Sequence, residues 1–600
     1  MSATSAVLPA APLSPDRLRH LGLALEGLDG AALTWVSGYV AGLAFERARA
    51  AGAAPAEPVA PPAATATVLY GSQTGNGRRL AERLKAQLDA AGIAARLVSA
   101  ADFPPRRLAD ERLLYLVVST HGEGDPPDDA RAFAEFVLGK RVPRLEQLAY
   151  AVFALGDSSY PRFCETGRLL DERLAGLGAR RLLPRVDADV DFEPAAAGWI
   201  EAARETARRE AGGPRLALVT PLRGSAAEPA APTRERPLAV EVLVNQPVTA
   251  AGALREVRHV EIALPEGGLG YEPGDALGIW PENPPSAVAE ITELLGAAPD
   301  AAVAHDGRTL PLVDWLGRER EITRLTRPFL EAHAKRAGSA ELAGLLAPGR
   351  QEALRAALRD LQVADLLREH PGAWSPAELV AALRPLAPRL YSIASSRSSV
   401  GDEAHLTVAL LAGERGGRAR LGAASSFLGR NAGEPLRTFL EPNPRFRLPA
   451  DGARDIIMVG AGTGVAPYRG FLQERVESGA TGRHWLVFGS RHLDRDFLYQ
   501  AEWLEALRKG RLQRLDVAFS RDTAQKRYVQ HCLLEQGAEL FAWLEAGATL
   551  YVCGDAERMA PDVHAALLEV VTRQSGRGTE AAAEYVAELA SDKRYLRDVY

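Results

Sequence analysis

The chain has 600 residues, with 71 lysines and arginines against 77 aspartates and glutamates, and a formal net charge of -6. At about 150 residues per domain, this length corresponds to roughly four domains and excludes a single small binding module. With 47% hydrophobic and 25% charged residues, the composition is typical of globular proteins and excludes disordered, fibrous and membrane-embedded chains. The charge balance argues against a strongly basic nucleic-acid-binding protein, so any cationic ligand site must be local.

Cysteine usage excludes several metal centres. Cys164, Cys532 and Cys553 are far apart, and neither a CxxC pair nor a Cys/His ligand spacing occurs. A disulfide framework and a zinc site are therefore not expected, and an iron-sulfur cluster needs about four thiolates. We therefore expect no resident metal. The N-terminal residues lack a basic region followed by an apolar core, so we expect a cytoplasmic protein without a membrane anchor.

The first half of the chain divides at two linkers. Within residues 1–50, a capping Ser14 and apolar residues at helical spacing predict a short helical segment. The alanine- and proline-rich residues 51–64 predict a linker. From 65 to 210, short apolar runs alternate with amphipathic segments, which predicts a parallel sheet with crossover helices, and residues 211–236 predict a second flexible linker.

The second half predicts two further domains. Strand patterns within 237–450 predict an antiparallel β-barrel, which a mainly helical insert interrupts at about 284–384. Residues 451–600 return to alternating strands and helices and predict a second α/β domain. The predicted fold is therefore multidomain, with a barrel between two α/β domains.

Three loops of the first α/β domain combine into one candidate site. Each follows a predicted strand, and loops at the carboxyl ends of parallel strands converge on one crevice. The first loop alone is more often a plain polar turn, but its hydroxyl and backbone N–H groups suit a phosphate. The candidate residues are Ser72, Gln73, Thr74, Gly75, Asn76, Gly77, Ser119, Thr120, His121, Gly122, Leu155, Gly156, Asp157, Ser158, Ser159 and Tyr160.

This set resembles the FMN site of flavodoxins. The resemblance implies that residues 72–76 hold the FMN phosphate, that Tyr160 stacks on the ring, and that the site continues through Pro161, Arg162, Phe163 and Cys164. On its own, Cys164 reads equally well as a small buried residue, as does Cys532. The acidic residues around Asp128 predict an ordinary solvated loop, with a docking face for a basic redox partner as the secondary reading.

A second candidate site lies in the predicted barrel. Arginine can pair with a pyrophosphate, tyrosine can stack on a flat ring, and a turn of small residues admits a phosphate closely. The residues are Arg389, Leu390, Tyr391, Ser392, Thr407, Val408, Ala409, Gly422, Ala423, Ala424 and Ser425. Together they resemble the FAD barrel of the ferredoxin-NADP reductase family, which adds Thr323 to the implied FAD contacts.

A third candidate site follows strands of the last domain. Gly462, Thr463 and Gly464 permit close approach to a pyrophosphate, although a lone glycine pattern is often only a tight turn. Downstream donors and cations suit the extra 2'-phosphate that distinguishes NADPH from NADH. They are Ser520, Arg521, Lys526, Arg527, Tyr528, Val529 and Gln530, and the family resemblance adds Asp562.

The end of the chain carries the implied catalytic residues. On their own, Cys553 reads as a buried residue and Tyr600 as a frayed terminus. The resemblance implies that Cys553 and Asp598 assist hydride transfer together with Ser392, and that Tyr600 covers the FAD ring.

The order of the three sites resembles the diflavin reductase family, in which NADPH reduces FAD, and FMN then passes single electrons onward. The segments LTWVSGYVAGL, YSIASS, FRLP and RYLRDVY point to the sulfite-reducing branch, although Gly413 replaces a frequent tyrosine. That branch implies a siroheme and iron-sulfur hemoprotein as partner and oligomerisation through the N-terminal region. Two alternatives remain: a diflavin reductase serving a cytochrome or another one-electron acceptor, and a non-catalytic flavin-binding assembly protein.

Overall fold

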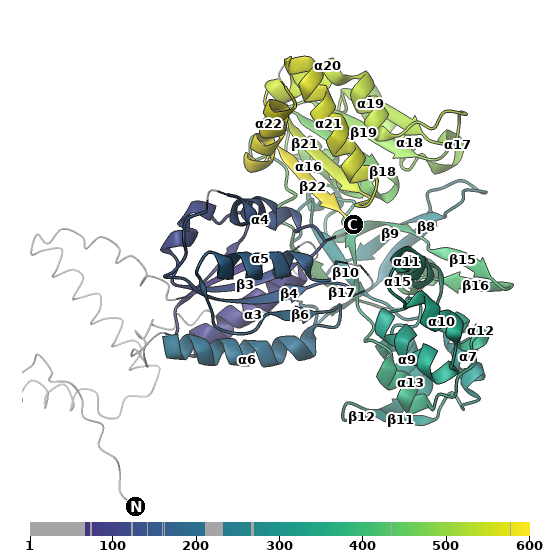
Figure 1. Cartoon of the computed structure of the whole chain (residues 1–600). Helices are drawn as coiled ribbons and strands as arrows, with labels where there is room; N and C mark the ends of the chain where they lie inside the picture. Colours follow the sequence, from purple (N-terminus) through teal and green to yellow (C-terminus); the bar gives the residue numbers. More distant parts are fainter. Residues whose placement is uncertain are drawn as a thin grey trace, which may run out of the picture.

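The computed structural model describes residues 66–72, 75–121, 124–140, 142–158, 160, 162–210, 232–265, 269–431, 433, 435–576 and 578–600. Figure 1 shows a first unit (66–210), a middle unit (232–450) and a last unit (451–600). The predicted N-terminal helical segment, the first linker and residues 211–231 of the second linker lie outside the described residues. Among the helices that the structure describes, none is both long and apolar enough to cross a membrane.

The first unit is a parallel sheet covered by helices on both faces. Its elements are β1 (Ala66–Gly71), α3 (Asn76–Ala90), β2 (Ala95–Ser99), η1 (Pro105–Asp110), β3 (Leu113–Ser119), η2 (Asp128–Ala130), α4 (Arg131–Leu138), β4 (Ala149–Leu155), α5 (Glu165–Gly176), β5 (Arg180–Arg181), β6 (Val186–Ala188) and α6 (Glu193–Glu210). The strand order is β2-β1-β3-β4-β5, and β6 also pairs with β4. The central strands β3 and β4 are buried along nearly their whole length, as their unbroken apolar runs predict.

The middle unit contains two antiparallel sheets. Their strands are β7 (Leu238–Val240), β8 (Val242–Pro247), β9 (Val257–Ala263), β10 (Ala276–Trp280), β13 (Arg389–Ser392), β14 (Glu403–Ala409) and β17 (Leu436–Glu441). The sheet orders are β13-β10-β17-β7 and β14-β9-β8, and an isolated bridge between Ile393 and Leu406 joins the two sheets. The antiparallel prediction is confirmed, while a closed barrel stays a prediction.

Smaller elements complete the middle unit. They are α14 (Arg397–Val400), the hairpin β15 (Ala412–Arg415) and β16 (Arg418–Leu421), and α15 (Ala423–Arg430). The insert contains α7 (Pro285–Leu295), β11 (Ala302–His305), β12 (Arg308–Pro311), α8 (Leu312–Asp314), η3 (Trp315–Glu319), α9 (Arg327–Ala337), α10 (Ala340–Leu345), α11 (Gln351–Asp360), α12 (Val363–Glu369) and α13 (Pro376–Ala382). The insert is mainly helical, as predicted. The sequence does not predict its β11-β12 hairpin, because the two strands that flank the turn Asp306-Gly307 are very short.

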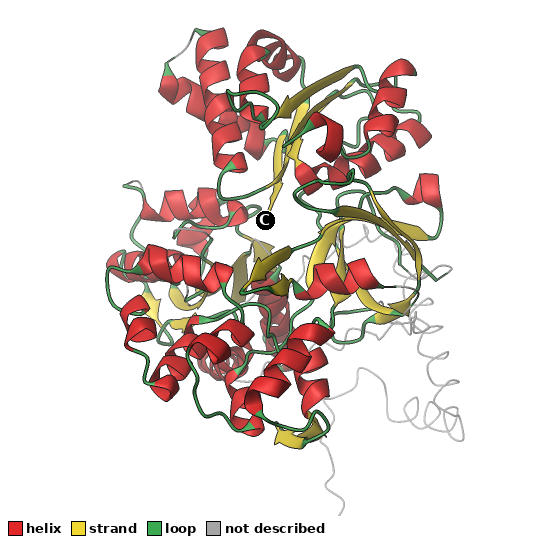
Figure 2. Cartoon of the chain, turned by 90° about the vertical axis from the view of Figure 1, so that its right-hand side faces the viewer, coloured by secondary structure: helices red, strands yellow, loops and turns green. Residues whose placement is uncertain are grey.

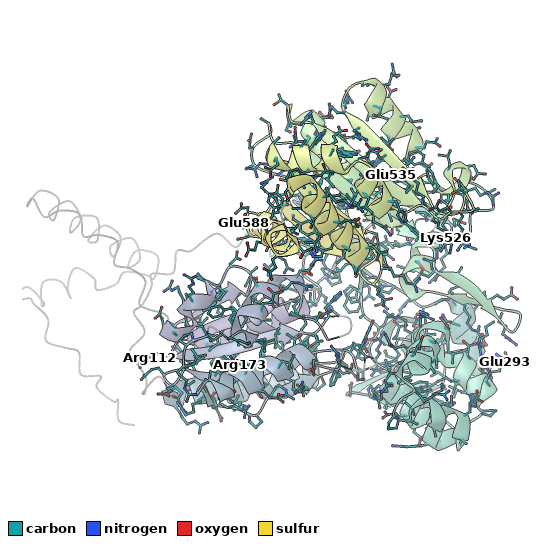
Figure 3. The ribbon with its side chains drawn as sticks, turned by 45° about the horizontal axis from the view of Figure 1, so that its top comes forward. Arg112, Arg173, Glu293, Lys526, Glu535 and Glu588 are labelled. Carbon is teal, nitrogen blue, oxygen red and sulfur yellow. The ribbon has the colours of Figure 1, made fainter. Side chains whose placement is uncertain are left out.

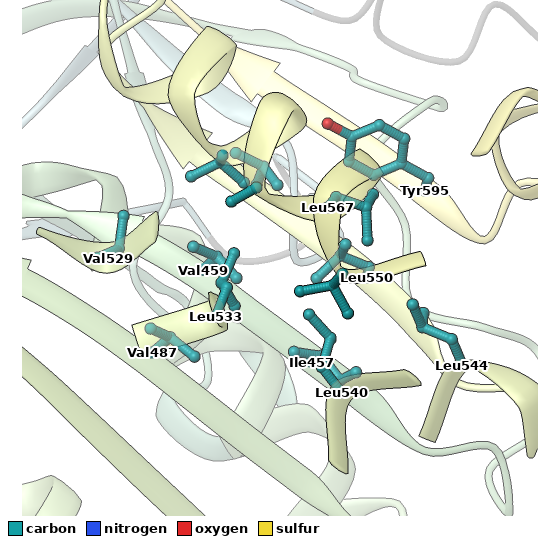
Figure 4. Packing of buried hydrophobic residues seen from close by; sticks show 14 of the residues in the cluster. Ile457, Val459, Val487, Val529, Leu533, Leu540, Leu544, Leu550, Leu567 and Tyr595 are labelled. Atoms are coloured by element: carbon teal, nitrogen blue, oxygen red, sulfur yellow. The ribbon is translucent and has the colours of Figure 1, made fainter. Parts of the chain in front are cut away.

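The last unit is a second parallel sheet with helices on both faces. Its elements are β18 (Ile456–Ala461), η4 (Gly462–Val465), α16 (Ala466–Glu477), β19 (His484–Ser490), α17 (Leu493–Asp496), α18 (Gln500–Arg508), β20 (Arg514–Phe519), α19 (Val529–Glu535), α20 (Gly537–Glu545), β21 (Thr549–Gly554), α21 (Met559–Ser575), α22 (Thr579–Ser591) and β22 (Tyr595–Val599). The strand order is β20-β19-β18-β21-β22. Figure 4 shows the core beneath one face, where Val459 and Leu550 of the sheet meet Leu533 and Leu567 of the helices.

The three units meet around the carboxyl edges of the two parallel sheets. Figure 1 shows the C-terminal strand of the last unit ending between the other two units, and in Figure 2 the C-terminus lies near the centre of the molecule. The described end of the second linker is fixed to the middle unit, because Trp280 Nε1 donates a hydrogen bond to the Arg234 carbonyl at 2.9 Å. The segment that follows the linker therefore begins from an anchored point.

Candidate functional site

The first-unit loops converge as predicted, because their strands end level with one another. Gly71 of β1 pairs with Val118 of β3, and Ser119 of β3 pairs with Leu155 of β4. The loops that follow these strands therefore leave the sheet at one edge. The Arg162 side chain of the third loop packs over Gly124 at the end of the second loop, so the two loops are in contact.

Hydrogen bonds within the predicted phosphate loop, and to a neighbouring carboxylate, fix its conformation. Gly77 N–H donates to Ser72 Oγ at 3.0 Å, and Ser72 N–H donates to both oxygens of Asp129 at 2.9 and 3.0 Å. Gly75 has a φ of 80°, which favours glycine, and precedes Asn76 at the start of α3. Polar groups at the start of a 15-residue helix fit a phosphate. Gln73 and Thr74 lie outside the described residues.

The other two loops place polar groups beside this edge. Thr120 Oγ1 accepts a hydrogen bond from Thr166 N–H at 3.1 Å, and Ser158 N–H donates to Asp189 Oδ1 at 3.1 Å. Tyr160 is half-buried, and burial raises its pKa. The Cys164 thiol points to the Ala188 carbonyl, 3.7 Å away, and is fully buried.

The remaining first-unit candidates have less specific surroundings. His121 forms an isolated bridge with Asp125, Ser119 Oγ donates to the Gly71 carbonyl at 3.2 Å, and Gly156 packs against Phe163. Gly122, Ser159 and Pro161 lie outside the described residues. FMN contacts by individual residues of this set stay predictions.

The FAD candidates of the middle unit lie on β13, β14 and the start of α15. Arg389 opens β13, where its Nη2 donates to Glu321 Oε2 at 2.7 Å, and Thr323 Oγ1 donates to Glu321 Oε1 at 2.7 Å. On β14, Thr407 Oγ1 bonds to the Tyr499 hydroxyl at 2.7 Å and Val408 is fully buried. The side chains of Thr407 and Val408 therefore face the protein, which leaves the strand's backbone for a ligand.

The turn before α15 is built from small residues. Gly422 precedes the helix, and the Ser425 hydroxyl accepts a hydrogen bond from Leu411 N–H at 3.0 Å. Ala423 and Ala424 present no polar side chain, so a phosphate at this helix start would meet backbone N–H groups. Leu390, by contrast, is 42% exposed on β13.

Ser392, Cys553 and Asp598 come together although they lie far apart in the sequence. The Ser392 hydroxyl donates to Asp598 Oδ2 at 3.1 Å, and the Cys553 thiol approaches the same oxygen at 3.9 Å. Cys553 and Asp598 are directly paired on β21 and β22. The end of β13 in the middle unit thus meets the carboxyl edge of the last-unit sheet, so the predicted FAD and NADPH sites adjoin.

Burial sets the protonation of this cluster. It raises the pKa of the Cys553 thiol well above its usual range, and the nearby Asp598 carboxylate adds to the shift. Burial also raises the pKa of Asp598, against which the Ser392 hydrogen bond acts. The thiol therefore stays protonated at neutral pH and can donate a hydrogen bond.

The C-terminal tyrosine is held in place. Its N–H donates to the Gly554 carbonyl at 3.1 Å, and its hydroxyl lies 3.2 Å from Thr463 Oγ1, while the residue is 62% exposed. Gly464 packs so tightly that an added Cβ would lie 2.2 Å from the Cys553 carbonyl oxygen. The terminus is therefore fixed over the Gly462–Val465 turn, and the frayed-end alternative is wrong for the backbone of Tyr600.

Some of the 2'-phosphate candidates have exposed side chains, and others are bound to protein partners. Ser520 and Arg521 follow β20, and Arg521 and Lys526 are exposed (Figure 3 labels Lys526). Arg527 instead pairs with Glu535 and donates to the Val517 carbonyl at 2.8 Å. Its guanidinium serves the last unit itself, so Arg521 and Lys526 are the cations that remain for a phosphate.

Other candidates beyond β20 also have partners. Gln530 Nε2 donates to Asp562 Oδ2 at 2.9 Å, which brings two predicted residues together. Val529 is buried against Gly489, and Tyr528 is 42% exposed. The two polar side chains therefore lie at one point, between α19 and α21.

Sequence reasoning missed several residues that complete these sites. Asn443 Nδ2 donates to Asp598 Oδ1 at 3.3 Å, and Glu321 holds Arg389 and Thr323. Nothing in the local sequence marks either residue, because Asn443 meets Asp598 and Glu321 meets Arg389 only through long-range contacts. The structure also gathers His259, Glu261 and His405, which have no ligand spacing in the sequence, but Arg469 donates to His405 Nδ1 at 3.2 Å and opposes a cation there.

The three cysteines are expected to resist alkylation in the folded protein. All are at most 1% exposed, and burial raises the pKa of Cys164 to about 12 and of Cys532 to about 11. The reactive thiolate is therefore scarce at pH 8, where an exposed cysteine is about one quarter ionised. We expect no rapid labelling by a thiol-specific chromophore until denaturant is added, and then three thiols per chain. Stoichiometric labelling of the native protein would contradict the burial of these side chains.

Comparison with protein families divides the chain in the predicted order. The flavodoxin profile matches residues 68–199, the FAD binding domain profile matches 231–311, and the oxidoreductase NAD-binding domain profile matches 458–565. The FMN, FAD and NADPH assignments are thereby confirmed, as is a multidomain fold with a flavodoxin-like, an FAD-binding and a nucleotide-binding domain in that order.

Similar proteins cover almost the whole chain. The sulfite reductase (NADPH) flavoprotein alpha-component of Shewanella sp. strain ANA-3 is 46% identical, over 98% of each chain. The proteins of the same name from Serratia proteamaculans strain 568 and Bacillus subtilis strain 168 are each 43% identical, over 98% of this chain. The chain is therefore an NADPH-dependent oxidoreductase that belongs to the family of sulfite reductase (NADPH) flavoprotein alpha-components.

Proposed function

We propose that this chain draws electrons from NADPH and delivers them through FAD and FMN to a separate hemoprotein, which reduces sulfite to sulfide. The observation that carries the proposal is the meeting of Ser392 on β13 with Cys553 and Asp598 on β21 and β22. It joins the FAD residues of the middle unit to the nucleotide edge of the last unit. When bound, FAD accepts two electrons as a hydride and FMN passes them on singly.

The chain's own groups have definite tasks in this proposal. Asp598 accepts hydrogen bonds from Ser392 and Asn443, which fixes the serine hydroxyl beside the nicotinamide position. The protonated, buried Cys553 thiol points at the same carboxylate, 3.9 Å from Asp598 Oδ2. These groups orient the reactants and exclude water, and pre-oriented groups of this kind supply much of an enzyme's rate acceleration.

Arginine-carboxylate contacts between described residues join the first unit to the other two. Arg445 Nη1 lies 2.5 Å from Asp129 Oδ2, Arg79 pairs with Glu441 at 3.2 Å, and Arg597 pairs with Asp128. Arg445 also donates to the Ser72 carbonyl at 2.9 Å. The predicted FMN phosphate loop is thus bonded to the segment just before the last unit, in an arrangement that supports electron transfer from FAD to FMN.

Charge reversal at Arg445 is expected to slow this transfer. In Arg445→Glu, a new carboxylate would face the buried Asp129 and repel it. Because Arg445 is half exposed, solvent screens part of the effect, and we expect roughly a three- to tenfold slower reduction of FMN by NADPH.

Stopped-flow absorbance of the flavins measures this effect, and the rate of FAD reduction within the same enzyme should remain unchanged. Arg359→Glu is the matched control, since Arg359 is exposed and pairs with its neighbour Asp360. An unchanged FMN rate in Arg445→Glu would show that this contact does not govern transfer.

The hemoprotein partner is supported by the name of the relatives, which describes an alpha-component. The partner is proposed to carry the siroheme and iron-sulfur cluster, for which this chain has too few cysteines. Oligomerisation through residues 1–50, the cytoplasmic location and the domain boundaries stay predictions.

The test of the function has two steps. The chain loaded with FMN and FAD is mixed with NADPH without oxygen, and the bleaching of both flavins is recorded; flavins that stay oxidised would refute the proposal. The reduced chain is then combined with a purified siroheme hemoprotein, and sulfide formed from sulfite is measured. Reduction of cytochrome c without sulfide formation would favour the alternative acceptor.

A further inference from the structure

A buried carboxylate joins two of the FAD candidates. Glu321 is 1% exposed, and its two oxygens bind different partners. Oε2 accepts from Arg389 Nη2 at 2.7 Å, while Oε1 accepts from the N–H and the hydroxyl of Thr323 at 2.9 and 2.7 Å. Arg389 and Thr323 come from segments far apart in the sequence, so Glu321 is the group through which they meet.

A second arginine balances the charge. Arg384 Nη2 lies 3.9 Å from Glu321 Oε2, and the Arg384 carbonyl accepts the Glu321 N–H at 3.0 Å. Burial opposes the ionisation of Glu321, yet the two arginines and Thr323 together lower its pKa, so it is charged at neutral pH. Two guanidinium groups and one carboxylate leave a net positive charge, which suits a pyrophosphate.

The contacts also fix the orientation of Arg389. Its Nη1 donates to the Ala387 carbonyl at 2.8 Å and its Nη2 donates to Glu321, so both terminal nitrogens of the guanidinium are anchored within the middle unit. Releasing Glu321 would leave a buried, unpaired charge, so Arg389 is expected to keep this contact when a ligand binds. Arg389 opens the strand that ends at Ser392, and its orientation therefore bears on the rest of the FAD site.

We infer that Glu321 is a positioning residue of the FAD site, which holds Arg389 and Thr323 in the orientation that binds the pyrophosphate of FAD. The inference rests on the FAD assignment of the middle unit. Glu321 does not contact FAD itself, because its negative charge would repel the pyrophosphate. It acts by holding Arg389.

The test measures FAD affinity in the full-length apoprotein. In Glu321→Gln, the amide oxygen can still accept from Thr323, but the amide nitrogen cannot accept from Arg389. We expect the Kd for FAD to rise tenfold or more, while the affinity for FMN stays unchanged. The melting temperature of the apoprotein should fall by several degrees, because two arginines lose a buried partner, but the protein should remain folded. Glu319→Gln is the matched control, because Glu319 lies in the same segment and pairs with Arg308 at 2.9 Å.

A double variant separates positioning from a general loss of structure. If Glu321 acts through Arg389, adding Glu321→Gln to Arg389→Ala should change the Kd by less than twofold. Fully additive losses, an unchanged FAD affinity in Glu321→Gln, or unfolding of its apoprotein would each overturn the inference. Failure of the unmodified chain and of Glu319→Gln to bind any FAD would instead refute the FAD assignment.

Discussion

Asp598→Asn is expected to slow the reduction of the enzyme by NADPH roughly 100-fold, the usual cost of removing one pre-oriented polar group from an active site. One carboxylate oxygen receives the Ser392 hydroxyl and faces the Cys553 thiol, and the other receives the Asn443 amide. An asparagine replaces one of these acceptor oxygens with a donor, so at least one partner loses its contact, and the neutral amide oxygen that remains holds the Ser392 hydroxyl less firmly than a carboxylate does. Stopped-flow bleaching of FAD after mixing with NADPH measures the rate.

The control for this substitution is Asp592→Asn, which changes an exposed aspartate just after α22. Bound FAD and NADPH affinity should stay close to those of the unmodified enzyme in both variants. Because Ser392 and Asp598 act as a unit, Ser392→Ala combined with Asp598→Asn should be little slower than the slower single variant. A bleaching rate within twofold of the unmodified enzyme would remove Asp598 from the reaction.

The sequence predicts the parts of the site that depend on strand ends. In a parallel sheet every strand terminates at the same edge, so reading β1, β3 and β4 from their apolar runs places residues 72–77, 119–122 and 155–160 together without any knowledge of long-range contacts. The same reasoning brings Gly462, Ser520 and Cys553 to one edge of the last unit.

Contacts between residues far apart in the sequence lie beyond what local patterns predict. Arg389 was predicted from its own segment, but the carboxylate that holds it follows η3 of the insert, and no periodicity links the two. Asn443 and Asp598 likewise belong to different units, the middle and the last, so no local pattern predicts their contact. Arg527 shows the opposite difficulty. Its place in a cluster of cations predicts a phosphate contact, but the structure shows that its guanidinium is already paired with Glu535.

Arg521→Ala is expected to reduce the preference of the enzyme for NADPH over NADH roughly 10- to 100-fold. Arg521 is exposed directly after β20, beside Ser520, and its N–H donates to the Arg491 carbonyl at 2.9 Å. That bond fixes its backbone and leaves the guanidinium for a ligand. A charge-assisted hydrogen bond to the 2'-phosphate is worth about 1.5 to 3 kcal/mol, and NADH lacks that group. The measurement is kcat/KM for each nucleotide with ferricyanide as acceptor.

Arg527→Ala provides the matched comparison, since both arginines lie in the same predicted cluster. Arg527 is bound to Glu535 and to the Val517 carbonyl, so its removal should lower the stability of the last unit while leaving the ratio of the two kcat/KM values within about threefold. Lys526→Ala should resemble Arg521→Ala with a smaller effect, because lysine meets a phosphate as a single charge rather than as a fork. If Arg521→Ala lowered kcat/KM equally for NADPH and NADH, Arg521 would contact a part that both nucleotides share. The 2'-phosphate would then have to be recognised by other residues.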